Sequence, residues 1–247
     1  MTQKMFGILV ILFLLSMYGC GKKENASPTA TLGAYAKDSL AVRNILDANG
    51  LGSVDVGGTI SPRDPNNTER IGELNLVNMN ISAIPNDIGQ LAGLHVLRLD
   101  SNSIVSLPAE IGNCSALTVL TACCNNLTAL PADIGKLTAL KILVLSHNSL
   151  TSLPSEIGNA KALTTLKLDF NSLSVLPSSI GALTLLQVVY INNNGLTALP
   201  AEITQCTSLG GGILTVDYNK LCSLPETIKS WMTNNAETNW AETQQCN

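Results

Sequence analysis

A 23-residue unit recurs along most of this chain and limits the folds that it can adopt. At this spacing asparagine returns at Asn102, Asn125, Asn148, Asn171 and Asn194, and once more at Asn219 after two extra residues in the glycine run 210–212. An earlier copy, at 71–93, has Met79 in place of the asparagine. Seven copies at a fixed period predict a stack of similar units, each of which contacts only its neighbours.

Each unit carries apolar residues at its first, fourth and sixth positions, as in Leu140, Leu143 and Leu145. We expect these residues to face the core around a short strand, because stacked units bury such a face continuously and one unit alone cannot. The asparagine amide has two donors and an acceptor, with which it can satisfy backbone groups of its own and the neighbouring turn. A proline later in each unit prevents the strand from continuing there.

The unit ends in the pattern LPxxIGxL, as in "LPADIGKL" at 130–137. This pattern resembles the repeats of the Ras-group leucine-rich repeat family of plants and animals, which also occur in bacterial proteins. The resemblance covers residues 71 to about 230. It implies an α/β solenoid, a leucine-rich repeat horseshoe with a parallel concave β-sheet.

Both ends of such a stack need capping. Upstream, Asp38 as N-cap, apolar residues at helical spacing (Val42, Ile45 and Leu46) and Gly50 as a stop predict a helix, followed by a loop at 55–69. Downstream, residues 225–246 predict a short helix and a tail, with Trp231 and Trp240 closing the core. The predicted division is a signal peptide at 1–19, a flexible tether at 20–36, an N-terminal cap at 37–70, seven repeats at 71–230 and a C-terminal cap at 231–247.

The first residues have the pattern of an export signal. Lys4 precedes an apolar run from Phe6 to Met17, which is shorter than the roughly 20 residues that span a bilayer but suits a signal-peptide core. The ending "SMYGC" resembles a bacterial lipoprotein signal, which implies a lipid on Cys20, although Met17 stands where that family usually has leucine. An ordinary signal peptide cleaved nearby, or an uncleaved short anchor, is the alternative. By the same resemblance, Gly21 favours the outer membrane.

An exported protein meets an oxidising compartment, in which disulfides persist. Cys222 and Cys246 bracket the predicted C-terminal cap, and a bridge between them would close a loop of about 25 residues, worth roughly 3 kcal/mol. Cys114 and Cys206 occupy equivalent core positions four repeats apart, about 20 Å at roughly 4.8 Å per strand. That is too far for a disulfide, so we expect both to be buried apolar substitutes.

Cys123 and Cys124 stand side by side at the seventh and eighth positions of the third repeat. At the same positions the next repeat has His147, the second repeat on has Asp169 and the preceding repeat has Asp100, so a soft-metal site or an activated thiol is one interpretation. The sequence shows no third fixed ligand and no oxyanion cradle. We therefore interpret the pair as incidental surface thiols.

Composition and motifs narrow the classes of function. The net charge is −4 and the chain has no basic cluster, which argues against nucleic acid as a partner. The sequence has two histidines and lacks a phosphate loop, "HExxH" and "GxSxG". We predict no catalytic residue, no metal and no cofactor.

We predict a monomeric, non-enzymatic protein-binding module on the bacterial envelope that binds its ligand on the concave face. The third-position row is apolar in five of seven repeats, but β-branched residues also simply favour strands. The aromatic residues at concave positions are more informative, because tyrosine is enriched at binding hot spots. The predicted ligand-binding set is Phe170, Tyr190 and Tyr218 with the polar rim Lys167, Asp169, Asp217 and Lys220. The alternative is a structural envelope lipoprotein that binds peptidoglycan or a surface glycan through exposed Ser, Thr and Asn.

Overall fold

The computed structural model describes residues 34–55, 59–61, 70–236 and 240–246. Cys20, the predicted signal peptide and tether residues 20–33 lie outside the described residues, so these assignments stay predictions. The last three residues of the predicted tether, 34–36, belong to a helix instead.

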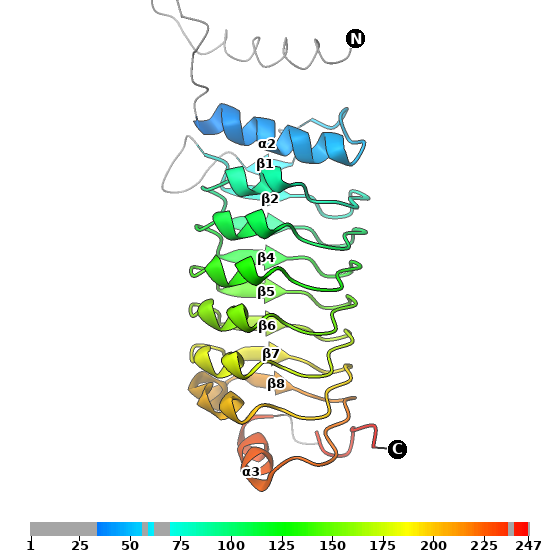
Figure 1. Cartoon of the computed structure of the whole chain (residues 1–247), viewed down its shortest axis with the longest axis vertical. Helices are drawn as coiled ribbons and strands as arrows, with labels where there is room; N and C mark the ends of the chain where they lie inside the picture. The colour runs from blue at the N-terminus through cyan, green and yellow to red at the C-terminus, as the bar shows by residue number, and fades with distance from the viewer. Residues whose placement is uncertain (1–33, 56–58, 62–69, 237–239, 247) are drawn as a thin grey trace, which may run out of the picture. The chain divides into compact units, whose positions relative to one another are not determined.

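One sheet of eight short strands runs through the repeats in chain order (Figure 1). The antiparallel β1 (Ile60–Ser61) lies at one edge, and the parallel strands are β2 (Glu73–Asn75), β3 (Val96–Arg98), β4 (Val119–Thr121), β5 (Ile142–Val144), β6 (Thr165–Lys167), β7 (Val188–Tyr190) and β8 (Ile213–Thr215). Each parallel pair aligns equivalent repeat positions, so Leu120 lies between Leu97 and Leu143. The predicted parallel solenoid sheet is confirmed.

The opposite side of each repeat is a five-residue 3₁₀ helix that follows a proline. These helices are η2 (Asn86–Gln90), η3 (Ala109–Asn113), η4 (Ala132–Lys136), η5 (Ser155–Asn159), η6 (Ser178–Ala182) and η7 (Ala201–Gln205), with an additional η8 (Thr207–Gly211) before β8. Neighbouring 3₁₀ helices pack so closely that a Cβ on Gly135 would lie 2.3 Å from the carbonyl oxygen of Glu156. The glycine of the LPxxIGxL pattern is therefore needed for the close approach of successive repeats.

The core lies between the sheet and the 3₁₀ helices. The first, fourth and sixth residues of the fourth repeat, Leu140, Leu143 and Leu145, are fully buried. Equivalent residues of the other repeats continue the same cluster along the stack. The predicted assignment of these positions to the core is confirmed.

The recurring asparagines form a ladder of buried and part-buried hydrogen bonds along one edge of this core. The Asn125 amide nitrogen donates to the carbonyl oxygens of Ala122 and Cys123 in its own repeat, and to that of Leu99 in the preceding one, at 2.9–3.3 Å. Its oxygen accepts from the backbone N–H of Ile104 at 3.0 Å. Each asparagine thus satisfies backbone groups of two repeats at once, as the amide chemistry predicts.

The N-terminal helix α2 (Ala34–Ala48) corrects one prediction. Asp38 lies inside this helix rather than at its N-cap, and it is fully buried. Its carboxylate accepts from the Arg70 guanidinium and from the backbone N–H of Ile71, both at 2.9 Å. Asp38 therefore ties α2 to the start of the first repeat. Gly50, with φ +72°, lies in the turn that follows the helix.

Residues 55–69 are also not a loop throughout. Ile60 and Ser61 form β1, which pairs antiparallel with β2 and covers the edge of the sheet. The remaining residues 56–58 and 62–69 lie outside the described residues.

At the C-terminal end, helix α3 (Glu226–Asn235) crosses residue 230, so the predicted boundary between repeats and cap falls within one element. Trp231 and Trp240 pack against the core. Beyond α3, the tail makes hydrogen bonds like those of one further repeat, or rung, of the asparagine ladder. The side-chain oxygen of Gln244 accepts from the backbone N–H of Leu221, and its nitrogen donates to the carbonyl oxygen of Val216.

We expect Asn148→Ala to lower the free energy of unfolding by about 3 kcal/mol, because it leaves several buried backbone groups without a partner. The Asn148 amide donates to the carbonyl oxygens of Ala122 and Leu145 and accepts from the N–H of Leu127. Asn126→Ala, at an exposed neighbouring position, is the matched control and should change stability little. Urea denaturation of both variants measures the difference, and equal midpoints would contradict the ladder's role.

Candidate functional site

The exposed side of the sheet is the candidate site, and we call it the sheet face. It consists of the third, fifth, seventh and eighth residues of each repeat, as in Val119, Thr121, Cys123 and Cys124. The third-position residues of β2 to β7 are half-buried, whereas Ile213 of β8 is exposed. Within the third-position row, the accessible apolar surface is therefore greatest at β8.

The eighth position of every repeat has a left-handed backbone. This row consists of Asn78, Ser101, Cys124, His147, Phe170, Asn193 and Tyr218, with φ between +53° and +56°. Each member of the row from Ser101 to Asn193 donates its N–H to the seventh-position carbonyl of the next repeat, as Phe170 does to Asn192 at 3.1 Å. Asparagine tolerates this conformation, whereas bulky side chains are strained in it. The fold therefore favours asparagine at these positions, not an aromatic ring.

Two ring contacts order side chains on the sheet face. His147 and Phe170 of adjacent rungs are stacked, with centroids 4.3 Å apart and planes 8° from parallel. Lys167 places its ammonium 4.6 Å from the centroid of the Tyr190 ring, a cation–π contact. Both contacts restrict side chains in neighbouring repeats, which lowers the entropy lost when a partner binds.

The predicted ligand-binding residues lie on neighbouring rungs at the C-terminal part of the sheet. Phe170 and Tyr218 are exposed in the eighth-position row, and Tyr190 is half-buried on β7. Lys167, Asp169 and Asp217 are half-buried around them, and Lys220 is exposed after the ladder asparagine of the last repeat. Whether this set binds a ligand stays a prediction.

The seventh-position aspartates also have structural partners that the sequence analysis missed. Asp169 accepts a hydrogen bond from the Ser146 hydroxyl, Asp217 accepts from that of Thr243, and Asp100 accepts from that of Thr121. Asn193 was missed as well, and His147 was considered only as a possible partner of the Cys123–Cys124 pair. The signal that marks them is the asparagine at 78 and 193, which points to a left-handed row at the eighth position.

Cys123 and Cys124 lie just beyond β4, half-buried and exposed respectively. Burial, the hydrogen bond to the Asp100 carboxylate and the neighbouring Cys124 raise the pKa of the Cys123 thiol to about 12. Cys123 is therefore protonated at neutral pH, which disfavours it as a nucleophile or a metal ligand. Among the described residues, no group of three or more His, Cys, Asp and Glu side chains is placed to hold a metal ion.

The other cysteines have structural positions. Cys114 and Cys206 are free and fully buried, and their thiols donate to the carbonyl oxygens of Ile88 and Ile180, which confirms them as core residues. Burial raises the pKa of Cys114 to about 12 and that of Cys206 to about 11. Cys222 and Cys246 form a disulfide with Cα atoms 5.7 Å apart, which attaches the tail to the last repeat.

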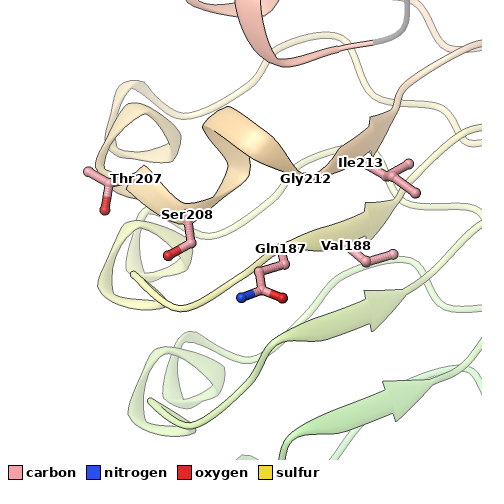
Figure 2. A pocket seen from close by; sticks show the side chains of 6 residues that line it. All are labelled: Gln187, Val188, Thr207, Ser208, Gly212 and Ile213. Carbon is pink, nitrogen blue, oxygen red and sulfur yellow. The ribbon is translucent and has the colours of Figure 1, made fainter.

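The two-residue insertion before β8 produces a hollow that the sequence analysis did not anticipate. Val188 pairs with Ile213, two residues later than the 23-residue period would give. The hollow has a volume of about 680 Å³ and uncharged walls, namely Gln187, Val188, Thr207, Ser208, Gly212 and Ile213 (Figure 2). Only glycine fits at 212, because a Cβ there would lie 1.9 Å from the carbonyl oxygen of Gln187. No titratable group lines the hollow, so its walls hold no acid or base for catalysis.

Within the described ranges, none of the helices is long and apolar enough to cross a membrane.

Comparisons with known proteins agree with the architecture. The family described as leucine-rich repeat region matches residues 124–211. A leucine-rich repeat protein of Leptospira interrogans has a TM-score of 0.62 and 30% identity, covering 71% of this chain and 44% of that one. The fold is a leucine-rich repeat solenoid.

Two plant receptors have the same solenoid. RGFR1, a plant peptide hormone receptor in complex with RGF2, has a TM-score of 0.55 and 32% identity, covering 63% of this chain and 26% of the receptor. The ectodomain of the receptor kinase SOBIR1 from Arabidopsis thaliana, at 24% identity and TM-score 0.55 over 67% of this chain and 96% of that one, supports the fold alone. This chain spans less than half of the Leptospira protein. No curated protein sequence matches it.

We expect the double variant Cys222→Ala with Cys246→Ala to loosen the C-terminal rung while leaving the N-terminal rungs unchanged, because solenoid repeats are coupled mainly to their neighbours. The N–H groups of Tyr218 and Gln245, which bond to Thr243 and Asn219, should exchange with solvent faster. The N–H of Ser101, bonded to Cys123, is the internal control. A uniform increase along the stack, or two free thiols in protein isolated from its native compartment, would contradict the role of the bridge.

Proposed function

We propose that this chain is a non-enzymatic protein-binding module of the bacterial cell envelope, and that its partner binds the sheet face of β6 to β8. One observation carries the proposal. Phe170 and Tyr218 are 44% and 51% exposed, although they occupy left-handed positions at which the fold favours asparagine.

The left-handed backbone at these two positions costs conformational free energy. A left-handed backbone costs roughly 1–2 kcal/mol for an ordinary L-residue, and less for asparagine. Neither exposed ring recovers this cost by full burial in the core. Strained residues that contribute little to folding are typical of functional surfaces. A partner that buries both rings would recover the free energy that the fold loses.

The surroundings of the rings suit a protein partner. Aromatic residues are enriched at the centre of protein interfaces, with polar residues at the rim. Here Lys167, Asp169, Asp217 and Lys220 provide both signs of charge around the rings. The likeness to a plant receptor described as binding a peptide hormone supports the same class of partner. Leucine-rich repeat folds are typically non-enzymatic interaction scaffolds.

The envelope location rests on the sequence. The apolar run from Phe6 to Met17 and the cysteine that follows support export and lipidation at Cys20. Gly21 after this cysteine favours the outer membrane. The protein would then act as a monomer held by its lipid.

Replacing the rings by asparagine separates binding from folding. Phe170→Asn and Tyr218→Asn should each weaken partner binding at least tenfold, because truncating a hot-spot residue costs about 2 kcal/mol or more. Their melting temperatures should stay equal or rise slightly, because asparagine relieves the left-handed strain. Ser101→Asn, at the same position of a distant rung, and Glu110→Ala, on the opposite side, are controls that should leave binding unchanged.

The partner itself is found by photo-cross-linking in intact cells of the source organism. A photoreactive phenylalanine analogue at 170 or 218 should give protein adducts, whereas the same analogue at 110 should not. The adducts identify the partner for the affinity measurements. Adducts only to peptidoglycan or surface glycan would support the structural lipoprotein instead, and equal adducts from position 110 would contradict a site on the sheet face.

The anchoring proposal has its own test. The wild-type protein should partition into detergent after processing, whereas Cys20→Ser should give a soluble or unprocessed form, because the lipid attaches to that sulfur. Cys124→Ser, which removes an exposed thiol, is the matched control and should partition like the wild type. Equal partitioning of wild type and Cys20→Ser would refute lipidation.

A further inference from the structure

Two aromatic residues of the eighth-position row, which we call the walls, lie on either side of a shorter residue, and we call the space between them the gap. Phe170 and Tyr218 are separated by one rung, which holds the short side chain of Asn193. The backbone keeps the three rungs in register, because Phe170 donates its N–H to Asn192 and Asn193 donates to Asp217. All three residues have φ between +53° and +55°, so their side chains leave the backbone in the same direction.

The width of the gap suits one aromatic ring. Neighbouring strands lie about 4.8 Å apart, so Phe170 and Tyr218 are about 10 Å apart along the stack. A ring midway between them would have its centroid about 5 Å from each wall, within the range of aromatic pairs in proteins. The stacked rings of His147 and Phe170, 4.3 Å apart, show that this row places rings of adjacent rungs face to face.

The floor of the gap offers hydrogen bonds. Within the described residues, the Asn193 amide makes no hydrogen bond, and the residue is half-buried. An asparagine side chain is shorter than that of phenylalanine or tyrosine, so Asn193 reaches less far from the backbone than the residues on either side of it in the row. The amide can accept from an indole N–H or bond to a phenol hydroxyl at the edge of an inserted ring.

The charges around the gap favour an amino-acid side chain over a nucleotide. Asp169 precedes Phe170 and Asp217 precedes Tyr218 in the chain, so two carboxylates flank the gap. The nearby ammonium of Lys167 lies over the Tyr190 ring. Lys220 is exposed beyond the ladder asparagine of the last repeat, so the charges next to the walls are the two carboxylates, which would repel a phosphate but not a neutral indole or phenol.

We infer that Phe170, Asn193 and Tyr218 form a slot that takes one tryptophan or tyrosine side chain of a protein partner. This inference rests on the proposed function and adds the anchor group that the partner inserts. The inserted ring extends the His147–Phe170 stack by one layer, and Tyr218 closes it on the other side.

The test uses small probes, so it does not need the partner. N-acetyl-tryptophanamide is titrated into the isotope-labelled protein and followed by NMR, with N-acetyl-leucinamide as the apolar control and adenosine as the nucleobase arm. We expect ring-current shifts concentrated at the Asn193 side-chain amide and the 170 and 218 rungs, with tryptophan binding several-fold tighter than leucine.

Variants assign the binding to the slot. Asn193→Phe fills the gap with a ring and should abolish these shifts, while Phe170→Ala, which removes one wall, should weaken binding roughly threefold to tenfold. Asn78→Phe introduces the same ring at the eighth position of a distant rung and should leave probe binding unchanged. Circular dichroism melting verifies that each variant is folded, and Phe170→Ala decides the question should Asn193→Phe not fold.

Equal shifts with tryptophan and leucine probes, shifts spread evenly over the sheet face, or unchanged binding to Phe170→Ala would overturn the slot. Tighter binding of adenosine would overturn the assigned class of occupant. Cross-linking of a protein at position 170, together with a failed probe titration, would leave the protein-binding function standing and refute the inserted ring alone.

Discussion

The recurring asparagine amide is the interaction on which the rest of this structure depends. Wherever the chain leaves a strand, backbone carbonyl and N–H groups of two consecutive repeats are turned toward the core, and a buried polar group without a partner is costly. One amide satisfies four of them at once in the case of Asn125. The leucines supply most of the burial, but they fit many arrangements. The amide requires one register, and so it fixes how each repeat sits on the next.

The same turn imposes a backbone strain on the residue that precedes each ladder asparagine. The residue before each ladder asparagine has a left-handed backbone, since the chain has to turn there while its N–H still bonds to the next repeat. Asn78 and Asn193 meet this requirement with little strain, whereas Phe170 and Tyr218 meet it with more. The ladder thus creates a row of side chains that project from the edge of the sheet. In this row, residues that serve binding can replace the asparagine that would strain the fold least.

Sequence periodicity predicts the repeats well because each repeat depends on contacts that every other repeat also makes. The strands, the register, the buried positions and the core cysteines follow from that regularity. Predictions fail where the role of a residue is set by a contact that no other repeat makes. Asp38 has the residue type of an N-cap, but its carboxylate instead bonds to Arg70 and to the N–H of Ile71, 33 positions away. The hollow beside Gly212 likewise depends on how an insertion folds, and the slot depends on a left-handed backbone at Phe170 and Tyr218, two residue types that do not indicate it.

The C-terminal tail connects the end of the fold to the candidate site. A solenoid's last repeat lacks the neighbour that completes every other one, and here Gln244 substitutes for the missing asparagine. The carbonyl oxygen of Thr243 accepts a hydrogen bond from the N–H of Tyr218, and the Thr243 hydroxyl donates to Asp217. The tail thus reproduces the contacts that a further repeat would make. The disulfide from Cys222 to Cys246 keeps this tail in place. Tyr218, one wall of the proposed slot, is therefore held by the tail that closes the stack. Conditions that reduce the disulfide would loosen Tyr218 before they affect Phe170.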